Sequence, residues 1–306
     1  MITVGVVTHR SADVLPGLLD SLPAGLAGVP DWRLVVADNA SPDDTVDLVR
    51  RRAPDALVVH TGGNRGYAAG VNACAAAVPS AEALLLLNPD VRLRPGAVAA
   101  MLAASATPGT GIVVPRLVGV DGRLAYSLRR RPTVTRALGE ALLGGRRAGR
   151  FAALSEVVTD PAAYTRPATC DWATGAVMLV TRRCLDTVGA WDESFFLYSE
   201  ETDFALRAAD AGLRVQLAPA AEAVHVGGEA HTSPRLWALL TANRVRLFTR
   251  RAGAVRGAVF WSAVLVGEAL RAARGGRSAG PHRAALNLLL GQRRNILGGR
   301  CVDFSP

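Results

Sequence analysis

One polar group in the sequence, Asn88-Pro89-Asp90, has the residue types and the position to hold a divalent cation. It comes directly after Ala83–Leu87, a continuous apolar run that is typical of a strand buried on both faces. A carboxylate at the end of such a strand offers the oxygen ligands that Mg²⁺ or Mn²⁺ binds beside a diphosphate. The same tripeptide is common turn chemistry, and taken alone it favours a turn.

A second acidic cluster, Glu200, Glu201 and Asp203, follows an aromatic stretch at Phe195–Tyr198. Acids in the first turn of a helix are ordinary capping residues. Apolar surroundings, however, raise the pKa of a carboxylate and make it a better general base near neutral pH. Both interpretations stay open, because one of these acids can cap the helix while its neighbour takes a proton.

His225 is a third candidate, at the end of the short apolar stretch Ala221–Val226 and just before Gly227-Gly228. A single histidine is more often structural than a ligand. Glycines beside it would let the backbone approach a bound group closely. A second histidine, His231, lies in the segment that follows.

The elements expected to position these groups alternate between strand and helix over the first hundred residues. Such alternation indicates a parallel sheet with helices on both faces, and ligands of such sheets bind at the carboxyl ends of the strands. Three polar groups fall at those ends: Thr8-His9-Arg10, Asp38-Asn39 and Asn88-Pro89-Asp90. We expect strands at Ile2–Thr8, Trp32–Ala37, Leu57–His60 and Ala83–Leu87, and helices at Asp13–Leu22, Asp44–Arg52 and Tyr67–Ala77.

The pattern weakens after the first half of the chain. Residues 129–169 contain runs of Arg and Gly and are interpreted as a variable or mobile insertion. A strand is expected within Asp171–Thr181, a helix over Glu200–Ala211 and another strand at Arg214–Leu217. From Pro234 onward the sequence predicts two or three helices, so the 306 residues suit one large domain with an appendage.

The charge of the chain is concentrated at its C-terminal end. All 35 basic residues are arginines, and thirteen of them, against three acids, lie between Glu229 and Pro306. This segment is expected to contact an anionic membrane surface rather than nucleic acid. A GC-rich coding sequence would also enrich Arg without a functional cause. The uncharged stretch Gly257–Gly267 is too short to span a bilayer and would lie in a membrane interface, or pack on the body or on a second subunit as in a homodimer.

Four widely spaced cysteines form neither a zinc motif nor a disulfide framework. No signal-peptide pattern precedes the first predicted strand. These features predict a cytoplasmic protein, bound peripherally to the inner face of the plasma membrane if the C-terminal segment contacts lipid.

Seven short segments occur in a fixed order, each at a predicted strand end or helix start. Together they resemble the family 2 glycosyltransferases, and most of all the bacterial rhamnosyltransferase-like branch, over roughly residues 1–250. The segments are Thr8-His9-Arg10, Val36–Ser41, Asn64–Asn72, Leu87–Val91, Thr174-Gly175-Ala176, Gly189–Phe196 and His225–Gly228.

The resemblance implies a GT-A fold: an α/β, mostly parallel sheet flanked by helices, with a Rossmann-like nucleotide-binding half and an acceptor half. We therefore expect a catalytic domain at 1–232, with its nucleotide-sugar half at 1–110 and its acceptor half, including the insertion at 129–169, at 111–232. Residues 233–306 would form a basic helical segment.

The resemblance also implies roles for individual residues. Glu201 matches the general base, with Glu200 left open for that role and Asp203 beside them. Asp90 and His225 would meet the metal, Mg²⁺ or Mn²⁺. Trp191, Asp192 and Tyr198 would lie on the acceptor side. The nucleotide sugar would be bound by Thr8, Arg10, Asp38, Gly66, Asn72, Asn88, Asp90, Gly175 and Ala176.

Two positions depart from the family pattern. Asn88 stands where the metal motif usually has a second acid, which leaves one carboxylate for the cation. Glu201 stands where an aspartate is more common, so the base is longer by one methylene group.

The implied reaction is inverting transfer of a sugar from a nucleotide donor to a hydroxyl acceptor, with rhamnose from dTDP-rhamnose expected first and a UDP- or GDP-sugar as the alternative. The acceptor would be a glycolipid, a cell-envelope polysaccharide or a secondary metabolite. A non-catalytic, membrane-associated nucleotide-sugar-binding module is a further alternative. A nucleotidyltransferase would have a Gly-rich phosphate loop where His9–Ala12 stands, and a dehydrogenase would have GxGxxG after a strand.

Overall fold

The computed structural model describes residues 1–227, 233–276 and 279–302, which form two compact units. The sheet unit comprises Met1–Leu128, Pro161–Phe196 and Glu200–Val226, and the helical unit comprises Arg129–Asp160, Leu197–Ser199 and the chain from Gly227 onward. Most of the predicted insertion thus groups with the C-terminal helices. The expected boundary at 232, together with Gly228 and His231, falls outside the described residues.

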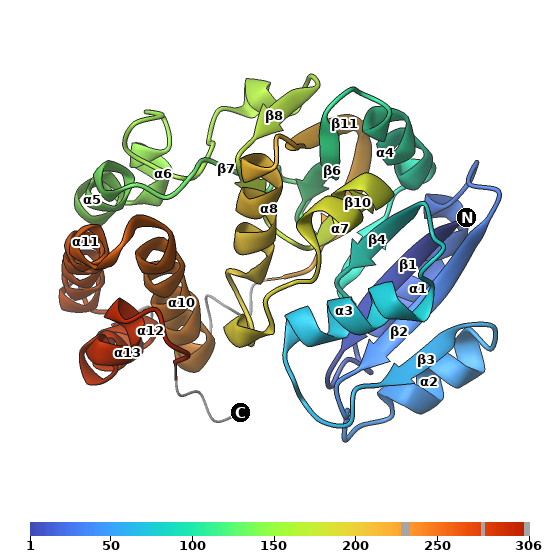
Figure 1. Cartoon of the computed structure of the whole chain (residues 1–306), viewed down its shortest axis with the longest axis horizontal. Coiled ribbons are helices and arrows are strands. Elements are labelled where there is room, and N and C mark those ends of the chain that lie inside the picture. Colours follow the sequence, from blue (N-terminus) through green and yellow to red (C-terminus); the bar gives the residue numbers. More distant parts are fainter. Residues whose placement is uncertain (228–232, 277–278, 303–306) are drawn as a thin grey trace. The chain divides into compact units, whose positions relative to one another are not determined.

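The sheet unit is built on one mixed sheet with the strand order β3-β2-β1-β4-β10-β6-β11-β5, with β8 paired to β11 (Figure 1). Its first four strands are parallel, as the alternating pattern predicted. The strand β10 runs antiparallel between β4 and β6. The strands are β1 (Ile2–Thr8), β2 (Trp32–Asp38), β3 (Leu57–His60), β4 (Ala83–Leu87), β5 (Val91–Leu93), β6 (Thr110–Val118), β8 (Ala168–Cys170), β10 (Val177–Thr181) and β11 (Arg214–His225).

Alternating side chains of β1 bring helices to both faces of the sheet. Val4 and Val6 join the buried cluster formed with α1 and α4. On the other face, the backbone of Gly5 lies against Cys74 of α3, where a Cβ atom would come within 3.0 Å of the Cys74 Cβ. The helices of this unit are α1 (Leu15–Gly25), α2 (Thr45–Arg52), α3 (Tyr67–Ala77), α4 (Ala97–Ser105), α7 (Arg182–Val188) and α8 (Glu200–Asp210).

The register of the sheet collects the predicted polar groups at one edge. Thr8 pairs with Asp38 in the parallel ladder of β1 and β2, and the Asn39 backbone N–H donates to the Thr8 carbonyl at 2.8 Å. The strand β11 is longer than the predicted Arg214–Leu217, because a register shift between Ala218 and Glu222 lets it continue to His225. That extension pairs His225 with Val91, next to Asp90.

Gly66 sets the start of α3 through a close contact with a segment distant in sequence. Its φ of +87° lies in the left-handed region that favours glycine. A Cβ atom at this position would lie 2.1 Å from the Phe196 carbonyl oxygen. The same carbonyl accepts a hydrogen bond from the Tyr67 backbone N–H at 2.7 Å. Only glycine allows this approach.

The helical unit contains α5 (Val134–Leu143), α6 (Gly145–Ala148), α10 (Pro234–Ala252), α11 (Ala254–Ala273), α12 (Ala279–Gly291) and α13 (Arg293–Leu297). Its apolar core joins Ala137 of α5 to Val245 of α10 and Phe260 of α11. None of the helices within the described residues is both long and apolar enough to cross a bilayer.

A buried ion cluster ties α5 to α10 in this unit. The Arg244 guanidinium donates to Glu140 Oε2 at 2.7 Å and to Glu156 Oε1 at 2.9 Å. Burial alone would raise the pKa of Glu140, but Arg244 and hydrogen bonds from Ser155 and the Glu156 backbone hold it below its ordinary value. Burial raises the pKa of Glu156.

The close contact at Gly66 predicts that adding a single methyl group at this position destabilises the fold. Gly66→Ala should lower the free energy of unfolding in urea by several times more than Gly62→Ala. Both positions have positive φ, which costs alanine about 1 kcal/mol, but a Cβ atom at Gly62 meets nothing within 4 Å. Equal losses in the two variants would contradict the proposed clash with Phe196.

The ion cluster predicts a large loss of stability when its cation is removed. Arg244→Met should destabilise the protein by about 3–5 kcal/mol, because two buried carboxylates would then face each other without a counter-charge. Denaturant unfolding would measure this. Arg256→Met, at an exposed position of α11, is the matched control and should change stability by less than about 0.5 kcal/mol.

Candidate active site

At one end of the site, Asp38 ties together the loops that follow β1 and β2. Its Oδ1 accepts a hydrogen bond from Thr8 Oγ1 at 2.9 Å, and its Oδ2 accepts one from the Ser41 backbone N–H at 3.0 Å. Arg10, in a left-handed conformation with φ +53°, donates its backbone N–H to Ser41 Oγ at 3.1 Å and leaves its side chain exposed. The buried carboxylate of Asp38 thus fixes the two loops through hydrogen bonds, and the Arg10 guanidinium faces solvent.

Asn39 connects these strand-end loops to the start of α3. Its side-chain Nδ2 donates to the Gly66 carbonyl at 2.9 Å, and its Oδ1 accepts from Thr61 Oγ1 at 2.8 Å. No separate role was predicted for Asn39, although it follows a predicted strand end.

Asn72 anchors the segment after α7 to α3. Its Oδ1 accepts from the Trp191 backbone N–H at 2.9 Å, and its Nδ2 donates to the Trp191 carbonyl and to Glu193 Oε1, both at 3.0 Å. The second oxygen of Glu193 is paired with Arg65 at 2.9 Å. These contacts hold the chain that leads to Phe196, whose carbonyl meets Gly66 and Tyr67.

Two residues expected on the acceptor side have structural contacts. Trp191 is buried, stacks on Phe204 with ring centroids 4.7 Å apart, and meets Tyr67 edge-on at 6.3 Å. Asp192 caps the short 3₁₀ helix Glu193–Phe195 by accepting from the Ser194 backbone N–H at 2.9 Å.

Tyr198, the third residue expected on the acceptor side, belongs to the helical unit. It has a positive φ of 68°, and its carbonyl accepts from Asn243 Nδ2 at 3.3 Å. Ser199 beside it also has positive φ, at 76°.

The carboxylate of Asp203 is held by a cation. Its Oδ2 lies 2.7 Å from Arg207 Nε, and the same guanidinium donates to the carbonyls of Val188 and Ala190. The carboxylate of Asp203 is thus already engaged by Arg207. The geometry therefore favours Glu200 or Glu201 over Asp203 as a base.

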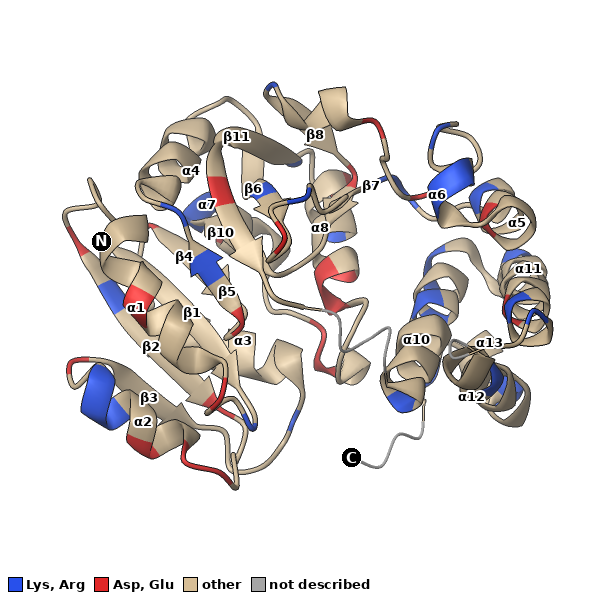
Figure 2. Cartoon of the chain, turned by 180° about the vertical axis from the view of Figure 1, so that it is seen from behind, with Lys and Arg blue, Asp and Glu red and all other residues tan. Residues whose placement is uncertain are grey.

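Three carboxylates, those of Asp90, Glu200 and Glu201, lie near enough to Tyr67 to act on its hydroxyl through their charge. Burial, followed by the negative charges of Glu200, Cys74, Glu201 and Asp90, raises the pKa of Tyr67 well above its ordinary value. Charges act in this way only from nearby, so Asp90 and the first turn of α8, whose acidic segment is visible in Figure 2, each lie in the neighbourhood of Tyr67. Tyr67 stood in one of the quoted motifs, but the sequence did not reveal its position among the acids.

The strand-end residues expected around the donor sugar also meet here. The Gly175 backbone packs on Glu201, so that a Cβ atom at Gly175 would lie 3.2 Å from the Glu201 Cβ. The next residue, Ala176, accepts a hydrogen bond through its carbonyl from the Asn88 backbone N–H at 2.9 Å. The turn that ends in Asp90 and the start of α8 therefore both adjoin Gly175-Ala176.

Asp90 and His225 form a pair that fits a divalent cation. The His225 Nε2 lies 3.3 Å from Asp90 Oδ2, with each side chain about one-fifth exposed. Two adjacent ligands of an octahedral ion, each about 2.1 Å from the metal, lie about 3 Å apart. No cluster of three or more His, Cys, Asp or Glu ligands occurs in the described ranges. Mg²⁺ and similar ions commonly take few protein ligands and complete their shell with substrate phosphates and water.

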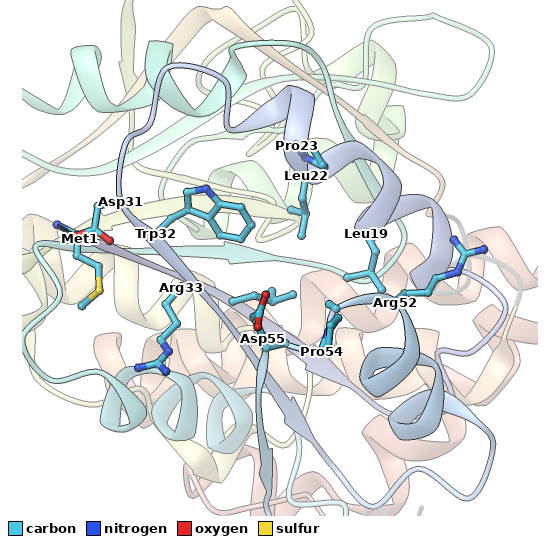
Figure 3. A pocket seen from close by; sticks show the side chains of 13 residues that line it. Met1, Leu19, Leu22, Pro23, Asp31, Trp32, Arg33, Arg52, Pro54 and Asp55 are labelled. Atoms are coloured by element: carbon cyan, nitrogen blue, oxygen red, sulfur yellow. Dashed lines mark ion pairs between the residues drawn. The ribbon is translucent and has the colours of Figure 1, made fainter.

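A cavity of about 610 Å³ lies at the opposite ends of β1 and β2, where Met1 precedes β1 and Trp32 begins β2. Figure 3 shows the Trp32 ring, Pro54 and Leu22 lining it. Because Thr8 and Asp38 stand at the other ends of the same strands, this cavity is separate from the acidic cluster.

Comparison with known proteins identifies the family. The sequence matches the family described as Glycosyl transferase family 2 over residues 3–158, and the one described as Glycosyl transferase family group 2 over residues 148–266. It is 31% identical over 248 residues to the N-acetylglucosaminyl-diphospho-decaprenol L-rhamnosyltransferase of Mycobacterium tuberculosis, covering 77% of this chain and 78% of that protein.

Two solved structures share the fold at low sequence identity. The mannosyltransferase of Pyrobaculum calidifontis, in complex with GDP-Man and Mn²⁺, aligns with a TM-score of 0.58 at 20% identity, over 96% of this chain and 80% of that one. GalNAc-T7, with UDP, GalNAc and Mn²⁺, aligns with a TM-score of 0.58 at 14% identity, over 81% of this chain, which spans 47% of that protein.

These matches confirm the predicted GT-A fold with its C-terminal helices and the predicted enzyme class. The chain belongs to glycosyltransferase family 2 and is similar to that family's rhamnosyltransferases.

Proposed function

We propose that the protein is an inverting glycosyltransferase that moves rhamnose from dTDP-rhamnose to a hydroxyl group of a lipid-linked acceptor. The observation that carries the proposal is the 3.3 Å pair of Asp90 and His225, together with the contacts of the Asp90 turn and of Glu201 with Gly175-Ala176. The similarity to an L-rhamnosyltransferase supports the sugar, and the diphospho-decaprenol in that relative's name supports a lipid-linked acceptor. A UDP- or GDP-sugar is the alternative donor.

Asp90 and His225 are the residues that would hold Mg²⁺ or Mn²⁺, and two structural neighbours contain Mn²⁺. A bound cation supplies positive charge to the diphosphate oxygens that become more negative as the donor bond breaks. With Asn88 in place of a second acid, the donor's own phosphates must provide more of the coordination. Metal binding should therefore depend on the nucleotide.

Glu201 would act as the general base. As the acceptor oxygen forms a bond with the anomeric carbon, the bond from that carbon to the diphosphate oxygen breaks, and the acceptor proton passes to the Glu201 carboxylate. Attack from the face opposite the leaving diphosphate inverts the anomeric centre in a single displacement. The contact between Gly175 and Glu201 supports this role, because Gly175 belongs to the backbone expected to line the donor-sugar pocket.

The two units would have different roles, substrate binding and membrane contact. The sheet unit contains Asp90, Glu200, Glu201 and His225, and it would bind donor and acceptor groups. The basic helical unit would contact the membrane from the cytoplasmic side, where a lipid-linked acceptor is presented. A module without catalytic activity is the competing proposal, and it predicts nucleotide-sugar binding without turnover.

A panel of dTDP-, UDP- and GDP-sugars with a polyprenyl-diphosphate sugar acceptor would test the activity. Divalent-cation-stimulated transfer is expected with dTDP-rhamnose above the other donors. Binding without turnover of any donor would favour the non-catalytic module, and the absence of binding to every donor would contradict the whole proposal.

Substitution of the base should separate chemistry from binding. Glu201→Gln should lower kcat by about 10²- to 10⁴-fold, the usual contribution of a general base, with little change in donor affinity. Glu200→Gln is the matched variant in the same turn of α8 and should retain most activity. Full activity in Glu201→Gln, with loss in Glu200→Gln, would assign the base to Glu200 instead.

Titration calorimetry of Mn²⁺ binding should test the two proposed metal ligands. In the presence of dTDP, Asp90→Asn and His225→Gln should each weaken Mn²⁺ binding by on the order of 10- to 100-fold or more, the loss seen even for residues that only support a ligand. Asp121→Asn, in an exposed turn, is the control and should bind like the wild type. Unchanged Mn²⁺ affinity in both ligand variants would contradict the assignment.

A further inference from the structure

The helix α11 presents an uncharged, largely apolar face to solvent. Val255, Val259, Val266 and Leu270 are all exposed, with Val255 reaching 82%. Their spacing places them along one side of the helix, with Ser262 in the middle of that stripe. The opposite side carries Phe260, Trp261 and Val264 into the core of the unit. The eleven-residue stretch Gly257–Gly267 thus divides into a buried side and an exposed side.

A second helix extends this exposed face. Gly267 of α11 packs on Ala141 of α5, where a Cβ atom at Gly267 would lie 3.0 Å from the Ala141 Cβ. Leu142 follows Ala141 directly, and Val266 directly precedes Gly267, so each helix has an exposed apolar residue next in sequence to this contact. Figures 1 and 2 both show α5 and α11 side by side. We call this surface the α5–α11 face: Leu138, Leu142, Leu143, Val255, Val259, Val266 and Leu270.

Arginines flank the α5–α11 face. Arg146, Arg147 and Arg150 follow α5 and are exposed, and Arg256 and Arg274 are exposed at the two ends of α11. An exposed apolar surface bordered by basic residues is typical of a site that binds another body, such as an anionic membrane.

The acids of the helical unit do not offset this charge at the surface. Glu140, Glu156 and Glu268 are buried, the first two against Arg244 and the third against Arg271. Among the described residues of this unit, Asp160 is the exposed acid, whereas Figure 2 shows basic segments on α6 and on the C-terminal helices. Burial of the glutamates leaves a strongly positive exterior, which complements a negative partner.

We propose that the α5–α11 face inserts shallowly into the interfacial region of an anionic bilayer, with the flanking arginines bound to lipid phosphates. This rests on the proposed function and deepens its membrane contact by naming the surface, which includes α5, a helix that precedes β10 in the chain, as well as the C-terminal helix α11. Leucine and valine side chains supply the apolar insertion, and arginines supply the preference for negative headgroups.

Co-sedimentation of the full chain with two kinds of vesicle tests the inference. One kind contains phosphatidylcholine alone, and the other contains phosphatidylcholine with about 30% phosphatidylglycerol, an anionic lipid. The wild type should partition preferentially onto the anionic vesicles, and added salt should weaken the binding. Leu142→Glu together with Val266→Glu should reduce partitioning by about tenfold or more. Val120→Glu, at an exposed apolar position in the sheet unit, is the matched control and should bind like the wild type.

Vesicle binding and sugar transfer can be tested independently. Glu201→Gln should bind vesicles normally, and the double variant should still transfer sugar to a water-soluble acceptor, so a failure of catalysis and a failure of membrane binding are distinguishable. Equal vesicle binding by the double variant and the wild type would overturn the inference. A second result would also overturn it: the wild type forms a dimer in sedimentation velocity and does not bind vesicles, and the double variant is monomeric. The face would then bind a second copy of the chain.

Discussion

The like charges of Asp90, Glu200 and Glu201 are the constraint on which the proposed active site depends. Burial first, and then these negative charges, raise the pKa of Tyr67. Carboxylates in one neighbourhood repel one another, and a divalent cation bound there would offset that repulsion. The 3.3 Å separation of Asp90 and His225 offers a place where the offsetting charge would be bound beside a diphosphate.

Neutral contacts hold this charged cluster in place. Gly66 approaches the Phe196 carbonyl, Asn72 fixes the backbone of Trp191, and the Asn88 N–H binds the Ala176 carbonyl. None of these contacts involves a free charge, so they do not compete with the cation for the acids. Asp203, in contrast, forms an ion pair with Arg207 on the same helix.

The sequence predicted the parts of the site that depend on local pattern. Thr8, Asp38 and Asp90 follow apolar runs that end at strand termini, and the parallel register collects them at one edge. The pairing of Asp203 with Arg207 was also readable, since residues four apart on a helix are neighbours. The contacts of Gly66 with Phe196 and of α5 with α11 join segments remote in sequence, and no local period encodes them. The structural tasks of Trp191 and Asn72 became visible only through such contacts.

The stereochemistry of the product tests the account most directly, because a single displacement assisted by Glu201 permits one outcome. NMR of the glycoside formed from a donor of known anomeric configuration would measure it through the one-bond carbon–proton coupling at the anomeric carbon. The account predicts a product of opposite configuration to the donor from the first turnover. A product that retains the donor configuration would contradict a one-step displacement and the role given to Glu201.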